Sequence, residues 1–252
     1  MESELLSLLC DPDSRYAFEQ EGNTLRNVAT GRVYPMRDGI PLFVSSLTGR
    51  DLRSQTVYDR VAPFYDGLLA LRRLMNKTPD PRPEYIALLE ASFGSRVLEV
   101  GVGTGANLPY LPIDTDFYGV DISWGMLRRC RSNLRKWRRD AHLFQCEAGH
   151  LPFRAAAFDC VLHSRGIRSF TSPKRAIAEM IWVARPGARI VIVEDTPRPL
   201  SQNNAAHGAN EPFIVDWIPE EMEQVEVRSL ANGTLECVSF RKPLDSAAEE
   251  QE

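Results

Sequence analysis

Two acids and three glycines, set close together in the sequence, are the residues best suited to chemistry. The segment reads Val97-Leu98-Glu99-Val100-Gly101-Val102-Gly103-Thr104-Gly105-Ala106-Asn107, and Asp121 lies twenty residues beyond Gly101. Glycine lets the backbone pass close to a ligand, and the N–H groups that open the following helix are free to bind polar groups. An acid at the tip of the next strand is placed to accept both hydroxyls of a ribose. The spacing therefore predicts a nucleoside site.

Glu99 indicates which nucleoside the site would hold. The glycines also satisfy the dinucleotide pattern G-x-G-x-x-A, which is a weak signal by itself. Beside a diphosphate, the Glu99 carboxylate would cost on the order of 3 kcal/mol per charge pair at about 5 Å and an effective dielectric of about 20. Beside the ammonium group or the sulfonium centre of S-adenosylmethionine (SAM), the same carboxylate is attractive. The acid therefore favours SAM over NAD as the cofactor.

The elements that position these residues alternate between strands and helices from about residue 84 onward. We expect strands at 96–100, 117–121, 142–146, 158–163 and 189–194, and helices at 84–93, 123–139 and 173–184. A closing antiparallel hairpin is expected at 225–229 and 234–240, with an Asn-Gly turn at Asn232-Gly233. Such alternation predicts an α/β fold with a doubly wound, mostly parallel sheet covered on both faces.

The composition bounds the rest of the chain. The 252 residues include 30 Lys plus Arg against 34 Asp plus Glu, a net charge of −4, which argues against a protein held mainly by nucleic-acid phosphates. No apolar run approaches the length of a membrane span, and acids near Met1 argue against a secretory signal. The five scattered cysteines indicate buried free thiols in a reducing compartment. These features predict a cytoplasmic protein.

Four stretches divide the sequence. Residues 1–48 alternate short apolar runs with turn signals, which predicts a small β-rich module. Residues 49–79 read as a helical lid or linker that ends at the proline-rich run 79–83. Residues 80–243 form the predicted SAM-binding domain, and residues 244–252 an acidic, disordered tail.

Five motifs in order resemble those of class I SAM-dependent methyltransferases. They are the glycine segment, Gly119-Val120-Asp121-Ile122-Ser123-Trp124-Gly125-Met126-Leu127, Glu147-Ala148-Gly149-His150-Leu151-Pro152-Phe153, Phe158-Asp159-Cys160-Val161 and Ala184-Arg185-Pro186-Gly187-Ala188-Arg189. The resemblance implies a seven-stranded Rossmann-like sheet in which Glu99 and the glycines hold the methionine part of SAM and Asp121 holds the ribose. It further implies that Ile122 and Met126 pack against adenine, with Glu147 and Ala148 at its edge.

Two further segments are similar to the ubiquinone/menaquinone C-methyltransferase group. They are Tyr58-Asp59-Arg60-Val61-Ala62-Pro63-Phe64-Tyr65-Asp66 and Gly166-Ile167-Arg168-Ser169-Phe170. This similarity implies that Tyr58 and Tyr65 fold over the SAM site as a lid, although aromatic periodicity alone is also typical of simple packing. The sequence departs from the group at Thr196–Pro212, a polar loop where the group has a helical insertion. We therefore do not carry the quinone substrate over, and expect an acceptor pocket that is open or completed by residues 1–79 or a second subunit, as in a homodimer.

The first module resembles a small zinc-ribbon family that activates methyltransferases. Its similar segments are Leu5-Leu6-Ser7-Leu8-Leu9-Cys10-Asp11-Pro12-Asp13 and Gly31-Arg32-Val33-Tyr34-Pro35-Met36-Arg37-Asp38-Gly39-Ile40-Pro41. We map the four ligand positions to Cys10, Asp13, Asn27 and Thr30. Only one thiolate survives, and Asn and Thr are poor zinc ligands. We expect a structural platform without zinc, and no metal elsewhere.

The remaining candidates are polar residues after the fourth strand and a basic helix. His163, Ser164 and Arg165 are placed to contact SAM or the acceptor, and His163 could equally be a satisfied strand-end histidine. The catalytic candidates are Tyr65, His163 and Arg165, none an unmistakable base. The predicted cofactor contacts are Tyr58, Tyr65, Glu99, Gly101, Gly103, Gly105, Asn107, Asp121, Ile122, Met126, Glu147, Ala148 and Ser164. The run of arginines at 128–139 with Trp137 could bind RNA, but more often such a run is a solvated helix face.

These features together predict an enzyme that moves a methyl group from SAM to a small organic acceptor, in specialised or quinone-like metabolism. The acceptor O, N or C atom would lie in line with the C–S bond, so catalysis by placement is the default. One alternative is a methyltransferase fold that binds SAM but catalyses a cyclisation or isomerisation. Another is an RNA-modification partner, suggested by the activator-like module and the basic helix.

Overall fold

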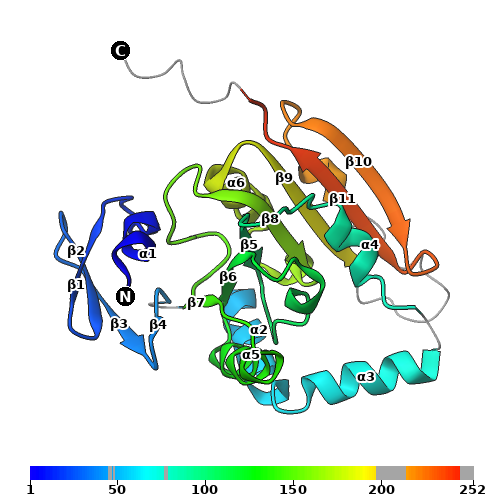
Figure 1. The fold of residues 1–252 in the computed structure, drawn as a ribbon, viewed down its shortest axis with the longest axis horizontal. Helices are drawn as coiled ribbons and strands as arrows, with labels where there is room; N and C mark the ends of the chain where they lie inside the picture. Colours follow the sequence, from blue (N-terminus) through cyan, green and yellow to red (C-terminus); the bar gives the residue numbers. More distant parts are fainter. Residues whose placement is uncertain (45–46, 48, 77–78, 197–213, 245–252) are drawn as a thin grey trace.

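Seven strands form the central sheet of the protein (Figure 1). The computed structural model describes residues 1–44, 47, 49–76, 79–196 and 214–244. The strand order is β10-β11-β9-β8-β5-β6-β7. The strands are β5 (Arg96–Val100), β6 (Asp116–Asp121), β7 (His142–Gln145), β8 (Phe158–Ser164), β9 (Ala184–Asp195), β10 (Glu223–Leu230) and β11 (Leu235–Arg241). The first five are parallel, and β10 and β11 join as an antiparallel hairpin, which confirms the predicted α/β sheet.

Helices cover both faces of this sheet because its central strands are apolar on both sides. On one face, Leu98 and Val100 of β5 pack with Ile177 and Met180 of α6 (Pro173–Val183). On the other face, Val97 packs with residues of α4 (Arg82–Ala87) and α5 (Trp124–Trp137). Short 3-10 helices lie at η1 (Leu108–Tyr110), η2 (Ile167–Ser169) and η3 (Ile214–Trp217). Because side chains alternate along β5, the strand contributes residues to two separate cores.

Four predicted elements differ in detail from the structure. The strand expected at 189–194 begins at Ala184, within the segment expected to form the preceding turn. The helix expected at 84–93 ends at Ala87, and Glu90 beyond it has a φ of +55°, which a helix cannot continue. The helical region 49–79 is split into α2 (Gly49–Val61) and α3 (Tyr65–Asn76), because Pro63 has no N–H to continue the ladder. The hairpin closes through the four residues 231–234, one residue later than the predicted connection 230–233, and Asn232-Gly233 lies within it as predicted.

A second, antiparallel sheet of four strands occupies the N-terminal region. It consists of β1 (Phe18–Glu21), β2 (Thr24–Asn27), β3 (Val33–Arg37) and β4 (Ile40–Pro41), and is preceded by α1 (Ser3–Leu8). The rings of Phe18, Tyr34 and Phe43 meet beneath it, with centroids 5.1–5.6 Å apart. The sheet matches the predicted β-rich module, whereas the helix α1 was not predicted.

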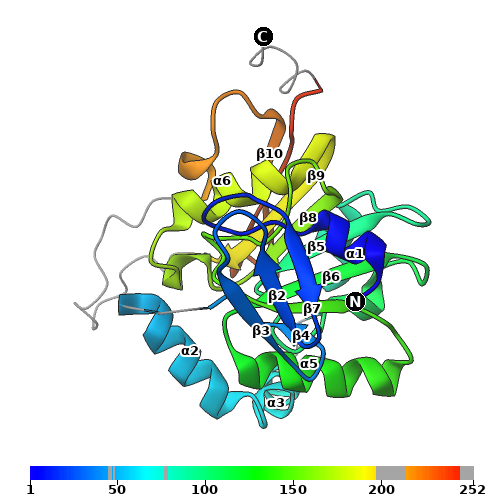
Figure 2. The same ribbon diagram turned by 90° about the vertical axis from the view of Figure 1, so that its left-hand side faces the viewer.

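The N-terminal sheet lies against the free edge of β7 (Figure 2). Leu42 bridges to Gln145 in parallel, and the Phe43 N–H donates to the Gln145 carbonyl at 2.7 Å. Leu9 bridges to Phe153, and both side chains are fully buried. An exposed strand edge is a site for unwanted pairing. The module therefore covers an edge that the central sheet would otherwise leave open.

Side-chain hydrogen bonds close the two turns at residues 11–14 and 27–30. Asp11 Oδ1 accepts the backbone N–H groups of Asp13 and Ser14, both at 2.9 Å. Asn27 closes the second turn in the same way, with its Oδ1 accepting from the N–H groups at 29 and 30, and its Nδ2 donates to Ser14 Oγ at 2.8 Å. Asp11, Ser14 and Asn27 therefore meet across the turns.

The residues that we mapped as ligand positions in the first turn, Cys10 and Asp13, have other partners. Cys10 is buried, with its backbone N–H bonded to the Pro152 carbonyl, and Asp13 pairs with Arg32. The convergent positions are Asp11 and Ser14, each one residue beyond those that we mapped, because their side chains satisfy the turn or its neighbour. In the described part of the chain, no three His, Cys, Asp or Glu residues are grouped to hold a metal ion.

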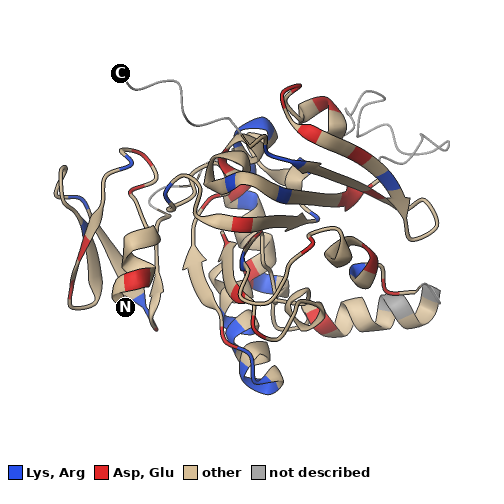
Figure 3. Ribbon diagram, turned by 45° about the horizontal axis from the view of Figure 1, so that its top comes forward, with Lys and Arg blue, Asp and Glu red and all other residues tan. Residues whose placement is uncertain are grey.

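Charges of both signs are interspersed over the molecule, as Figure 3 shows with Lys and Arg in blue and Asp and Glu in red. Within the basic run of α5, Arg129 pairs with Asp66 at 2.7 Å and Arg131 with Asp38 at 3.1 Å. Arg139 donates to the carbonyl of Pro112 at 2.8 Å. These arginines tie α5 to its neighbours, which favours the structural interpretation of the run over an RNA site.

All five cysteines are buried free thiols, as predicted. Burial raises the pKa of Cys160 and of Cys237 to about 12, so neither thiol is ionised near neutral pH. They act as small apolar side chains of the core.

Candidate functional site

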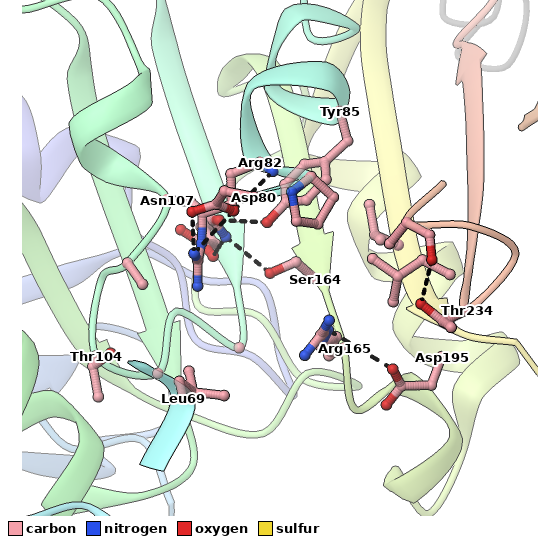
Figure 4. Close-up of a pocket in the computed structure, with 18 of the residues that line it drawn as sticks. Leu69, Asp80, Arg82, Tyr85, Thr104, Asn107, Ser164, Arg165, Asp195 and Thr234 are labelled. Carbon is pink, nitrogen blue, oxygen red and sulfur yellow. Dashed lines mark hydrogen bonds and ion pairs between the residues drawn. The ribbon is translucent and has the colours of Figure 1, made fainter. Parts of the chain in front are cut away.

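Two adjoining cavities open at the carboxyl ends of β5, β6, β8 and β9. The larger has a volume of about 520 Å³ and is drawn in Figure 4; the smaller has a volume of about 100 Å³. Tyr65, Gly101, Gly103, Ser164 and Arg165 line both. The carboxyl edge is where open α/β sheets bind ligands. All but one of the predicted cofactor residues line at least one of the two cavities.

The exception is Gly105, which lines neither cavity. A Cβ at this position would lie 2.8 Å from the sulfur of Cys130 in α5, and its φ is +77°. Gly101 and Gly103 also have positive φ, and the Gly103 N–H donates to Asp121 Oδ2 at 2.8 Å. Gly101 and Gly103 thus shape the surface of the cavities, while Gly105 lets the turn pack against α5.

Asp121 ends β6 in the wall of the smaller cavity. Its Oδ1 accepts the Ser123 N–H at 2.8 Å, which starts α5, and burial raises its pKa to about 6. The carboxylate is therefore held in one orientation by N–H groups from two turns, with lone pairs left toward the cavity. The other lining residues of this cavity include Tyr58, Ile122, Met126, Glu147, Ala148 and Phe170.

Glu99 is the most unusual group of the site. It is the penultimate residue of β5, lines the larger cavity and is 1% exposed. Oε1 accepts from Asn107 Nδ2 at 2.6 Å, whereas Oε2 has no hydrogen-bond partner. Burial raises the pKa of Glu99 to about 8. A buried carboxyl with one unsatisfied oxygen is suited to a cationic ligand, as the sequence predicts.

Asn107 joins three elements around Glu99. Its Oδ1 accepts from the Tyr85 hydroxyl of α4 at 2.6 Å, and its Nδ2 also donates to Ser164 Oγ of β8 at 2.8 Å. Figure 4 shows Tyr85, Asn107 and Ser164 meeting across the cavity wall. Tyr85 was missed by our sequence reasoning, because its only signal was an apolar position in a helix. The network holds the Glu99 carboxyl in place.

Two helices cover the smaller cavity with the predicted lid residues. The rings of Tyr58 in α2 and Tyr65 in α3 are 6.4 Å apart with planes at 73°. Burial raises the pKa of Tyr58 to about 12 and also raises the pKa of Tyr65, so both stay neutral phenols. Both residues line a cavity, so their role is not limited to packing the helices against the core.

The acids beside these tyrosines fasten the two helices to α5. Asp59 Oδ1 accepts from Ser123 Oγ at 2.6 Å and from the Gly125 N–H at 2.7 Å, so it caps α5. Asp66 pairs with Arg129 and accepts from Asn133 Nδ2 at 3.0 Å. These roles were not predicted, although both acids belong to the motif that carried the resemblance. Each acid anchors the helix whose neighbouring tyrosine faces the site.

The two remaining catalytic candidates differ in what they can do. His163 is fully buried, with Nδ1 2.7 Å from the Val100 carbonyl; its Nε2 has no partner, and burial lowers its pKa. It is a neutral ring in the cavity wall. Arg165 lines both cavities with a 40% exposed side chain, 3.9 Å from Asp195 Oδ1. Arg165 is thus a cation at the boundary of the two spaces.

The far wall of the larger cavity comes from segments without a recognised motif. Asp80 and Arg82 form an ion pair at 2.9 Å, and the Tyr110 hydroxyl donates to Asp80 Oδ2 at 2.8 Å. Leu69 of α3 and Thr234 of the β10–β11 loop also line it (Figure 4). In the sequence we interpreted the Pro-rich run only as the end of a helix. Of the loop expected at Thr196–Pro212, only Thr196 is among the described residues. The tail beyond Leu244 also lies outside them.

Comparisons with known proteins agree with this geometry. Residues 98–192 match the protein-family model described as "Methyltransferase domain". The demethylmenaquinone methyltransferase of Renibacterium salmoninarum is 36% identical over 152 residues, which cover 60% of this chain and 62% of that protein. The phosphatidylethanolamine N-methyltransferase of Cereibacter sphaeroides is 36% identical over 107 residues, 42% of this chain and 53% of that protein.

A solved structure resembles the fold over a longer range. The crystal structure of the [4+2]-cyclase SpnF matches with a TM-score of 0.63 at 15% identity, covering 80% of this chain and all of that one. At that identity the likeness concerns the fold alone. The chain spans less than two thirds of the length of the curated relatives described above. No helix in the described part of the chain is both long and apolar enough to cross a membrane.

Proposed function

We propose that this chain is a SAM-dependent methyltransferase similar to the ubiquinone/menaquinone C-methyltransferase group, and that it methylates a small organic acceptor in the larger cavity. The observation that carries the proposal is the unpartnered Glu99 oxygen, buried beside the glycine turn and Asp121. Such a pair of acids fits a cationic nucleoside. The names of the relatives favour methyl transfer over cyclisation.

We assign the binding of the cofactor to the residues that line the smaller cavity and the adjoining wall of the larger one. Glu99 would meet the ammonium group and Asp121 the ribose hydroxyls. Ile122, Met126 and Ala148 would pack against the base. Bound SAM supplies a methyl group already activated by its sulfonium centre.

The protein then needs to orient the acceptor and exclude water. Tyr58 and Tyr65 cover the smaller cavity, and Leu69 narrows the larger one. Arg165 would hold an acceptor oxygen that carries negative charge, because it lies at the junction of both spaces. His163 lines the smaller cavity, and because burial lowers its pKa it is a weak base, so it would position a ligand through Nε2 rather than receive the acceptor's proton.

The first acceptor to test is a quinol of the demethylmenaquinone type. A relative at 36% identity is named for that substrate, and a phenolic oxygen fits the cation at Arg165. We further propose that the N-terminal sheet is a platform for the domain, that residues 49–79 act as its lid, and that the protein works in the cytoplasm. Dimer formation remains a prediction.

The test is calorimetric titration of the protein with SAM. Asp121→Ala should abolish detectable binding, because the buried site loses its ribose acceptor. Asp116→Ala is the matched control: it lies at the opposite end of β6, where Asp116 pairs with Arg96, and should bind as the wild type does. A wild-type protein that binds no SAM, or an Asp121→Ala variant that binds equally well, would contradict the proposal.

A further inference from the structure

The helix α3 exposes an apolar face that nothing in the described chain covers. Apolar residues recur at helical spacing along one side of it: Phe64, Leu68, Leu71 and Met75. These residues and the neighbouring Leu74 are 53–76% exposed. None of the described side chains of α3 is buried. Figure 1 shows α3 extending beyond α5, apart from the sheet. A helix of this length gains most of its stability by burying its apolar side, and the described residues offer no surface that buries this side of α3.

Among the described side chains, the exposed charges of α2 that have no ion-pair partner are arginines. Arg50, Arg53 and Arg60 are exposed and make no ion pair within the described residues. The acids of the two helices all have partners: Asp51 is buried and accepts the Thr171 N–H, the exposed Asp59 caps α5, and Asp66 pairs with Arg129. Arg72 and Arg73 add two cations to the sequence of α3. An overall acidic chain thus presents bare arginines and large apolar side chains on the same pair of helices.

We propose that α2 and α3 dock on the surface of an anionic phospholipid bilayer, with the apolar side of α3 in the interface. Interfacial helices combine burial of apolar area with attraction to anionic lipids, and here α3 offers the apolar side chains while the preceding helix α2 carries the exposed arginines. A second copy of this chain fits less well, because two faces that both carry unpaired arginines repel each other.

The same helix forms a wall of the larger cavity. Tyr65 and Leu69 of α3 and Pro79 beyond it line that cavity, so docking brings its mouth to the bilayer surface. An acceptor that partitions into lipid would then reach the site without crossing water. This conclusion about the acceptor rests on the proposed function, whereas docking itself does not.

The test is co-sedimentation of the full chain with vesicles. Wild-type protein should bind vesicles containing phosphatidylglycerol, bind pure phosphatidylcholine vesicles more weakly, and be released as salt shortens the Debye length. The double variant Leu68→Gln/Leu71→Gln should bind about tenfold more weakly, since two large apolar side chains lose their interface. Phe93→Gln/Ile113→Gln is the matched control, because Phe93 and Ile113 are even more exposed apolar side chains that lie outside α2 and α3, and their loss should not matter.

Several outcomes would overturn the inference. Wild-type protein that does not sediment with anionic vesicles, or a control variant that loses as much binding as the α3 variant, would refute docking. Light scattering that shows a dimer which Leu68→Gln/Leu71→Gln dissociates would identify a second copy as the occupant. SAM titration of the same samples separates the two proposals: vesicle binding without SAM binding breaks the proposed function alone, and the reverse breaks only this inference.

Discussion

The two cavities of the site are built by different means. The smaller one is lined mainly by residues at the ends of β5, β6 and β8, where backbone N–H groups and buried acids are fixed by the sheet. The larger one has a far wall assembled from α3, the Pro79–Arg82 segment, β9 and the β10–β11 loop. The first depends on local backbone geometry and the second on how distant segments meet. We therefore expect changes at the smaller cavity and at Glu99 to act on the cofactor, and changes at the far wall to act on the acceptor.

After Asp121→Ala, the largest effect is expected from Glu99→Gln. The variant should bind SAM roughly 30-fold more weakly, because it removes a charge-assisted bond worth about 2 kcal/mol. Burial raises the Glu99 pKa to about 8, so the free protein holds a proton there at pH 7 that a cationic ligand displaces. Wild-type affinity should rise from pH 6.5 to 8 and level off above, with proton release visible by calorimetry in buffers of different ionisation enthalpy.

The control for this experiment lies on the opposite wall. Asp195→Asn changes an acid of the larger cavity whose side chain is 59% exposed. It should keep both the affinity for SAM and its pH dependence. If Glu99→Gln released protons on binding as the wild type does, the assignment of that proton to Glu99 would be wrong.

The same substitution should make the ligand-free protein more stable at alkaline pH. The folded-state pKa of Glu99 is raised from 4.5 to about 8, so the stability contributed by the neutral form is full below pH 4.5 and is lost as pH rises through 8. Glutamine keeps the acceptor for Asn107 without this loss. The melting temperature of Glu99→Gln should exceed that of the wild type by roughly 5 °C at pH 9 and by much less at pH 5. A variant that melts lower than the wild type at pH 9 would show that the ionised Glu99 carboxylate does not destabilise the folded protein.

One hydroxyl deletion on each side of the site compares the two walls directly. Tyr85→Phe leaves the buried Asn107 Oδ1 without its donor and should cost about 1–2 kcal/mol of unfolding free energy, with weaker SAM binding. Tyr110→Phe removes a bond to Asp80 from a 40% exposed residue and should cost less than about 0.5 kcal/mol. Urea unfolding of both variants measures the difference. Equal costs would mean that the Asn107 network has no special rigidity.

The same contrast explains which residues could be predicted from the sequence. Glu99, Gly103 and Asp121 were predicted because strand-tip positions follow from the βαβ pattern, and a local motif fixes their geometry. Tyr85 and Asp80 could not be predicted, because their roles depend on where a proline-rich segment passes over the sheet. No periodicity records that path.

In the N-terminal region the sequence predicted the β-rich module but not its internal contacts. The turn signals at 11–13 and 38–39 are local and set the strands. The hydrogen bonds among Asp11, Ser14 and Asn27 depend on how the two turns pack together. Our mapping of the first turn named residues one position earlier, and so did not predict these contacts. Docking of the module on β7 is likewise a tertiary event that the strand pattern does not encode.

The smallest effect on SAM is expected at Arg165, which lies on the boundary between the cavities. Its guanidinium is a cation beside a space suited to a cationic ligand, and its partner Asp195 is 3.9 Å away. Arg165→Gln should therefore leave SAM affinity within about twofold of wild type, or slightly tighter, since a partly exposed charge contributes little. The KM for an acidic acceptor should rise about fivefold, because the charge that faces its oxygen is lost. A large loss of SAM binding with an unchanged acceptor KM would place Arg165 on the cofactor side and erase the division drawn between the two cavities.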